Sequence, residues 1–82
     1  MNIYAVKDVK IGFNEPFLQA NEAVAIRTFK TMINGLNTPV KGYEEDIELW
    51  QIGTYDERTG KITTTTEEPK YIIGGKDVKK NA

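Results

Sequence analysis

Cysteine and histidine are both absent from this sequence of 82 residues. Without cysteine there are no disulfide bonds and no thiolate metal ligands, and the chain suits a reducing cytoplasm. Without histidine as well, only carboxylates remain to hold a metal ion, so we expect neither a metal site nor a cofactor. The same absences remove the commonest general base and the usual nucleophile–base pairs. We therefore expect that the protein is not an enzyme.

Long apolar runs are missing too. No segment approaches the roughly 20 apolar residues of a membrane span. The N-terminal stretch MNIYAVKDVKIGF (1–13) lacks the basic and apolar regions of a signal peptide. We expect an intracellular protein with no membrane partner. A chain this short buries only about 60% of the surface that its unfolded form exposes, so a homodimer would be one way to enlarge a small core.

The sequence also lacks a strong excess of positive charge. The net charge is −1, with five basic and three acidic side chains in residues 1–42 and six basic and nine acidic side chains in residues 43–82. The first half therefore carries +2 and the second half −3. Proteins that bind the phosphate backbone are usually clearly basic. Binding to a nucleic acid would thus need a local basic patch.

The first half of the chain predicts a strand, a loop and a helix. Residues 2–9 are rich in β-formers and predict a strand. Glycine, asparagine and proline in GFNEPFLQ (12–19) predict an ordered loop that packs onto the domain through its aromatic residues. Asn21 is a good N-cap for a helix over 21–34. Apolar residues at three- and four-residue steps form the stripe of this helix: Ala25, Ile26, Phe29, Met32, Ile33 and Leu36.

The second half predicts a β-hairpin. IELWQIGTY (47–55) reads as a strand, residues 56–60 as the turn and KITTTT (61–66) as the returning strand. KYIIGG (70–75) is either a short fourth strand or an apolar tail, and residues 76–82 are expected to fray. We therefore predict one α+β domain over residues 1–75. Its antiparallel sheet has three or four strands in β-α-β-β order and is covered on one face by a single helix.

Two sets of side chains are candidates for a binding surface. Aromatic rings on an open sheet face stack single-stranded bases, which makes Tyr4 and Tyr55 candidates. Trp50 has the same chemistry, although a place in the core or in a dimer interface is the alternative. Arg27 and Lys30 lie three apart on the helix face away from the stripe. With Lys7 and Lys10 they are expected to form one basic surface, the alternative being an ordinary solvated helix face.

Three segments of the chain together resemble a known family: IYAVKDVKIGFNEPF (3–17), NEAVAIRTFKTMIN (21–34) and YEEDIELWQIGTYDERTGKI (43–62). Their order and spacing resemble the small nonstructural protein of the gokushoviruses, which are microviruses with circular single-stranded DNA genomes. The matching motifs are Pro16-Phe17, the A-x-R-x-F pattern of 25–29, and Asp46 through Asp56 closed by Thr59-Gly60.

The resemblance implies a DNA-binding or DNA-synthesis-associated phage protein in the host bacterial cytoplasm. It further implies a role with single-stranded genomes at the switch from replication to packaging, and it makes Arg27 a matching position for a DNA contact. Two hypotheses follow. In the first, a dimer binds single-stranded DNA through Lys7, Lys10, Arg27, Lys30, Tyr4 and Tyr55. In the second, Trp50 and Ile72 form an interface with a second copy, the replication initiator or a capsid protein, without DNA contact.

Overall fold

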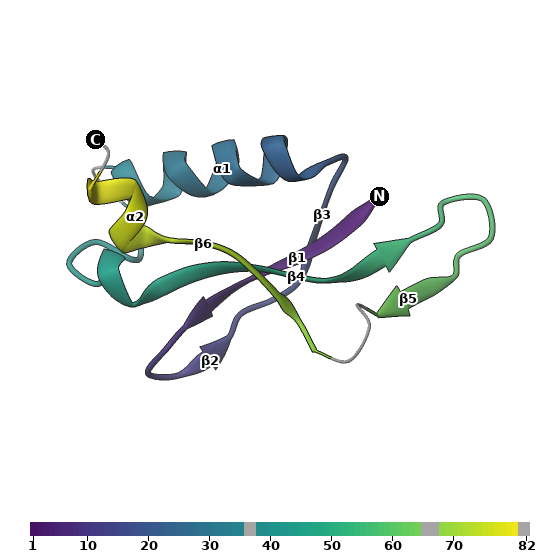
Figure 1. The fold of residues 1–82 in the computed structure, drawn as a ribbon, viewed down its shortest axis with the longest axis horizontal. Helices are drawn as coiled ribbons and strands as arrows, with labels where there is room; N and C mark the ends of the chain where they lie inside the picture. The colour runs from purple at the N-terminus through teal and green to yellow at the C-terminus, as the bar shows by residue number, and fades with distance from the viewer. Residues whose placement is uncertain (36–37, 65–67, 81–82) are drawn as a thin grey trace.

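A computed structural model describes residues 1–35, 38–64 and 68–80 of the chain (Figure 1). Its strands and helices follow one another in this order: β1 (Asn2–Asp8), β2 (Gly12–Phe13), β3 (Phe17–Gln19), α1 (Glu22–Asn34), the 3-10 helix η1 (Glu44–Asp46), β4 (Ile47–Tyr55), β5 (Ile62–Thr64), β6 (Lys70–Gly74) and α2 (Gly75–Lys80). The six strands form one curled antiparallel sheet, like half of a barrel. No helix in the described ranges is long and apolar enough to cross a membrane.

The long strands β1 and β4 pair antiparallel at the centre of the sheet. Each outer edge consists of two short strands. On one side, β2 and β3 pair with opposite ends of β1, and on the other side β6 and β5 pair with opposite ends of β4. The β4–β5 hairpin projects beyond the rest of the sheet (Figure 1).

The predicted fold class is wrong. The structure is mostly β, with six strands and two α-helices in the described ranges, rather than three or four strands and a single helix. The difference begins in residues 12–19, which we expected to be a loop. Gly12 and Pro16 do interrupt the chain there, yet Phe13 and Phe17 still pair with β1. Strands of two and three residues are too short to show the alternation by which strands are recognised in a sequence.

Helix α1 confirms the prediction for residues 21–34 and covers one face of the sheet (Figure 1). Asn21 is its N-cap, since its Oδ1 accepts a hydrogen bond from the Val24 N–H at 3.0 Å. The buried helix residues lie at the predicted spacing, namely Ala25, Phe29 and Ile33. They form the core with Tyr4, Ile47, Leu49 and Val78. Leu36, the last residue of the predicted stripe, lies outside the described residues.

Residues 76–80 of the predicted tail are helical and belong to the domain, so the predicted boundary after residue 75 is also wrong. α2 follows β6 directly, and Val78 is buried in the core. Gly75 makes this docking possible, because a Cβ at this position would clash with the backbone carbonyl oxygen of Glu44. Residues 81–82 of the predicted tail and residues 65–66 of the predicted returning strand lie outside the described residues.

Candidate nucleic-acid interface

The two faces of the central sheet carry different side chains. Residues directly opposite each other in an antiparallel pair point to the same face, and successive residues alternate. Tyr4, Val6 and Leu49 point to the side covered by α1, where they contribute to the core or pack against it. The pairs Ala5–Trp50, Trp50–Tyr71 and Lys7–Phe13 therefore lie on the other face. No helix of the part of the chain that the structure describes covers this open face (Figure 1).

Three aromatic rings meet on the open face. The Trp50 ring lies 5.9 Å from the Phe13 ring at an interplanar angle of 78°, and 5.6 Å from the Tyr71 ring at 81°, measured between centroids. Both contacts are edge-to-face, an arrangement that the charge distribution of aromatic rings favours. Phe13 and Trp50 come from β2 and β4, on either side of β1. The small side chain of Ala5 on β1 leaves room for these two rings to meet.

A lysine lies over two of these rings. The Lys7 Nζ is 5.1 Å from the centroid of Trp50 and 5.3 Å from that of Phe13. Both distances are within the roughly 6 Å over which an ammonium is attracted to a ring face. We call Lys7, Phe13, Trp50 and Tyr71 the aromatic–lysine cluster.

The polar ends of two rings in the cluster are held by carboxylates. Trp50 Nε1 donates a hydrogen bond to Glu48 Oε1 at 3.0 Å, and the Tyr71 hydroxyl donates one to Asp77 Oδ2 at 3.1 Å. The Asp77 carboxylate also accepts from the Gly74 N–H at 3.3 Å. Phe13 and Tyr71 are nevertheless 46% and 42% exposed. The cluster therefore presents ring surface to solvent, while the hydrogen bonds to Glu48 and Asp77 fix the orientation of two of its rings.

The environment of Tyr71 keeps its hydroxyl protonated. Burial of the side chain, its hydrogen bond to Asp77 and the negative charges of Asp77 and Glu48 raise the pKa of Tyr71 to about 12. The ordinary pKa of tyrosine is about 10. The Tyr71 hydroxyl therefore remains a hydrogen-bond donor to Asp77 of α2 up to a higher pH than an ordinary tyrosine would.

The variant Tyr71→Phe is expected to lose less stability at alkaline pH than the parent protein does. Since folding raises the pKa of Tyr71, the folded state holds this proton more tightly, and the stabilisation is fully present below about pH 10. It is lost as the pH rises through the folded pKa of about 12. The free energy of unfolding should thus fall more steeply in the parent protein than in Tyr71→Phe between these values. Tyr43→Phe, at an exposed tyrosine outside the cluster, is the control. A pH-independent difference would contradict this account.

The structure distributes the predicted stacking and interface residues over three environments. Tyr4 is fully buried, and its hydroxyl accepts a hydrogen bond from Asn2 Nδ2 at 2.9 Å, so its ring is not available for a base. Ile72, predicted at an interface, packs against the core. Trp50 lies on the open face, away from α1. Tyr55 lies at the end of β4, where its N–H donates to the Met1 carbonyl at 2.7 Å.

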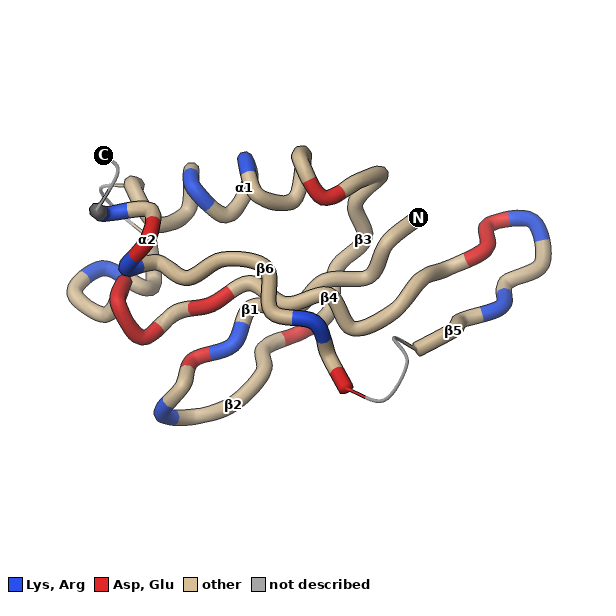
Figure 2. The backbone as a smooth tube through the Cα atoms, in the orientation of Figure 1, with Lys and Arg blue, Asp and Glu red and all other residues tan. Residues whose placement is uncertain are grey.

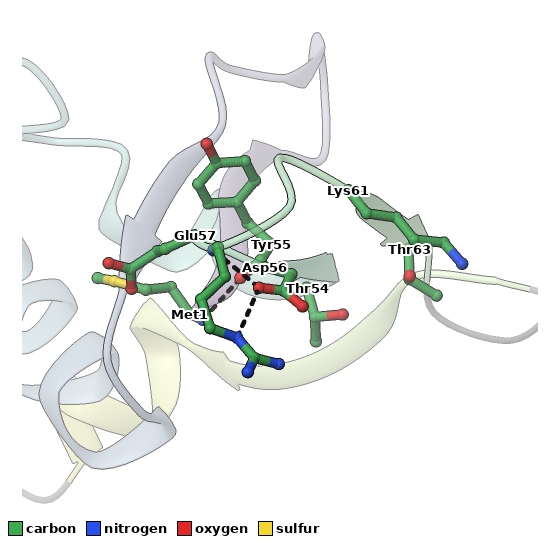
Figure 3. Close-up of a pocket in the computed structure, with 8 residues that line it drawn as sticks. Met1, Thr54, Tyr55, Asp56, Glu57, Lys61 and Thr63 are labelled. Atoms are coloured by element: carbon green, nitrogen blue, oxygen red, sulfur yellow. Dashed lines mark hydrogen bonds and ion pairs between the residues drawn. The ribbon is translucent and has the colours of Figure 1, made fainter.

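Tyr55 lines an open groove beside the projecting hairpin (Figure 3). Lys61 and Thr63 lie on one side of the groove, with Met1 and Glu57 on the other. Its charged side chains are balanced, with Asp56 and Glu57 against Arg58 and Lys61. Asp56 is also paired with Arg58 at 3.7 Å. The side chains that line the groove therefore carry no net charge.

The expectation of a single basic surface is wrong. Arg27 and Lys30 are exposed on α1, whereas Lys7 belongs to the open face and Lys10 to the turn between β1 and β2. Figure 2 shows the basic residues of α1 well separated from those of the β1–β2 hairpin, with the sheet between them. Arg27 and Lys30 on the helix therefore form one basic patch, and Lys7 and Lys10 on the hairpin belong to another.

Phe13 and Tyr71 are the members of the cluster that sequence reasoning missed as binding residues. Phe13 falls in the segment predicted as an ordered loop (12–19), and Tyr71 falls in the segment predicted as a fourth strand or an apolar tail (70–75). Their meeting depends on the pairing of β2 with β1 and of β6 with β4. Among the described residues, no group of three or more acidic side chains is placed to hold a metal ion.

Comparison with known proteins gives one match. The model of a family described as "Phage ORF5 protein" matches residues 1–78 of the chain. The matched region extends from β1 into α2 and includes every member of the aromatic–lysine cluster. No curated protein and no solved structure matches the chain.

Proposed function

Because the chain belongs to the family of phage ORF5 proteins, we propose that it is a phage nonstructural protein that binds single-stranded DNA through the aromatic–lysine cluster. The observation that supports the proposal is the set of three partly exposed rings beside a lysine on the open face of the sheet. Proteins that bind single strands without sequence preference stack bases on such rings and neutralise the backbone with nearby cations. In the cell, the bound strand would be the phage genome during its replication or at the switch to packaging.

The charges around the cluster favour stacking as the main source of affinity. Lys7 is the cation of the cluster, while Glu48 and Asp77 lie at its rim. On single strands the logarithm of the binding constant falls by about 0.7 per logarithmic unit of salt for each neutralised phosphate. One or two phosphate contacts therefore imply a shallow salt dependence. This differs from the steep dependence expected for a continuous surface of Lys7, Lys10, Arg27 and Lys30.

Titration with a fluorescently labelled single-stranded oligonucleotide at two salt concentrations tests the proposal. Polarisation reports binding, and the emission of Trp50, the one tryptophan of the chain, reports contact at the cluster. We expect binding with quenching of Trp50 and only a modest loss at high salt. Absence of binding at low salt would overturn a direct DNA role. Arg27→Ala is the matched control, because only binding across α1 would make this variant weaker.

A protein-interaction module is the second candidate. Tryptophan and tyrosine are enriched at protein interfaces, and the chain also exposes Ile11 by 85% and Tyr43 by 63%. These two line one groove together with Pro39. In this alternative the chain forms a homodimer or binds a replication or capsid protein, without DNA contact. Sedimentation equilibrium at micromolar concentration tests the homodimer, and a monomer would count against it.

A further inference from the structure

We infer that Lys7 gates the aromatic–lysine cluster: its ammonium covers the rings of Phe13 and Trp50 in the free protein and moves to a phosphate when a base stacks on them. The inference rests on the proposed function and specifies how the same site is regulated. It makes Lys7 a positioning residue with two alternative partners, the rings and the DNA backbone.

The position of the ammonium carries the inference. The Lys7 Nζ lies 5.1 Å from the Trp50 centroid and 5.3 Å from the Phe13 centroid. Stacked aromatic groups place their ring centres about 4.5–7 Å apart. The ammonium thus occupies the distance range in which the ring of a stacked base would lie. A base and the ammonium cannot share this space, so stacking on that ring surface requires the lysine to leave.

The two partners of Lys7 respond differently to salt. The contact with the rings is local and partly shielded by neighbouring side chains, since Lys7 is half-buried. A contact between the displaced ammonium and a phosphate at the surface would be weakened by salt. Removal of the ammonium therefore has two opposing effects on DNA affinity. It frees the rings under all conditions, and it removes a phosphate contact that matters mainly at low salt.

The test compares Lys7→Gln with the parent protein, first without DNA. Acrylamide, an uncharged quencher, measures the accessibility of Trp50, and circular dichroism verifies the fold. We expect stronger quenching in Lys7→Gln. Lys7→Arg keeps a cation over the rings and should resemble the parent protein. Lys10→Gln removes an exposed lysine of the same hairpin and should also leave the quenching unchanged.

Binding of the same labelled single-stranded oligonucleotide at low and high salt completes the test. We expect Lys7→Gln to bind more weakly than the parent protein at low salt and more tightly at high salt. The gain at high salt should be about two- to five-fold, which corresponds to the lower end of the range for cation–π contacts.

The outcomes separate the inference from the proposed function. Unchanged quenching of Trp50 in Lys7→Gln would overturn the gating role, and so would the absence of any gain in affinity at high salt, because Lys7 would then be a phosphate contact only. Increased quenching without DNA binding by any of the proteins would overturn the proposed function and still support the covering of the rings by Lys7.

Discussion

Replacing Phe29 by alanine is expected to cause a large loss of the stability of the fold. Phe29 is 2% exposed, at the centre of the buried stripe of α1. Truncation of a buried phenylalanine costs about 3–5 kcal/mol, because burial is lost and a cavity remains. Stabilities of roughly 0.05–0.15 kcal/mol per residue would give a chain of 82 residues about 4–12 kcal/mol. The variant would thus lose about a quarter of the free energy of unfolding if the parent protein lies at the upper end of this range, and would be unfolded if it lies at the lower end.

Urea denaturation followed by circular dichroism measures this loss. Thr28→Ala, at the neighbouring exposed position of the same helix, is the control and should unfold at nearly the midpoint of the parent protein. Alanine favours helices more than threonine does, so a slight increase in stability is expected there. If Phe29→Ala unfolded at the parent midpoint, packing of α1 against the sheet would not be the main source of stability.

The sequence predicts correctly the helix and the long central strands, because the pattern of their own residues is enough to identify them. Asn21 and the stripe from Ala25 to Ile33 define a helix locally, and the structure agrees with both. The long central strands likewise contain enough residues to show their β character. The short strands β2 and β3 do not, because a pair such as Gly12–Phe13 becomes a strand only by pairing with β1. The predicted fold class is wrong mainly because both strands on the β1 side of the sheet are of this kind.

The candidate site was harder to predict than the central elements. Trp50 was expected in a strand, but both faces of that strand are partly apolar, so the sequence did not define which face it joins. A register shift between Leu49 and Trp50 in the pairing with β6 adds to this ambiguity. Tyr4 shows the converse, since it is predicted as a base-stacking ring on an open sheet face, whereas the ring completes the core. Lys7 was predicted as a phosphate contact, and its position over two rings depends on long-range pairing.

Replacing Trp50 by alanine is expected to cause the largest loss of DNA affinity of any single change in the cluster. Stacking on an aromatic side chain contributes about 1–3 kcal/mol per base, which corresponds to about 5- to 150-fold in the dissociation constant. The loss should lie toward the upper end of this range. Trp50 touches both Phe13 and Tyr71, so its removal also releases the two flanking rings from their fixed orientation.

Polarisation of a labelled single-stranded oligonucleotide measures this effect, because the variant has no tryptophan emission. Trp50→Phe keeps an aromatic face but cannot donate the hydrogen bond to Glu48, so it should retain much of the affinity. Trp50 lies on the face opposite to α1, and urea denaturation should therefore show a smaller loss of stability for Trp50→Ala than for Phe29→Ala. Unchanged affinity of a folded Trp50→Ala would place DNA binding on another surface. Equal losses for alanine and phenylalanine would mean that the indole N–H and its bond to Glu48, rather than the ring face, determine binding.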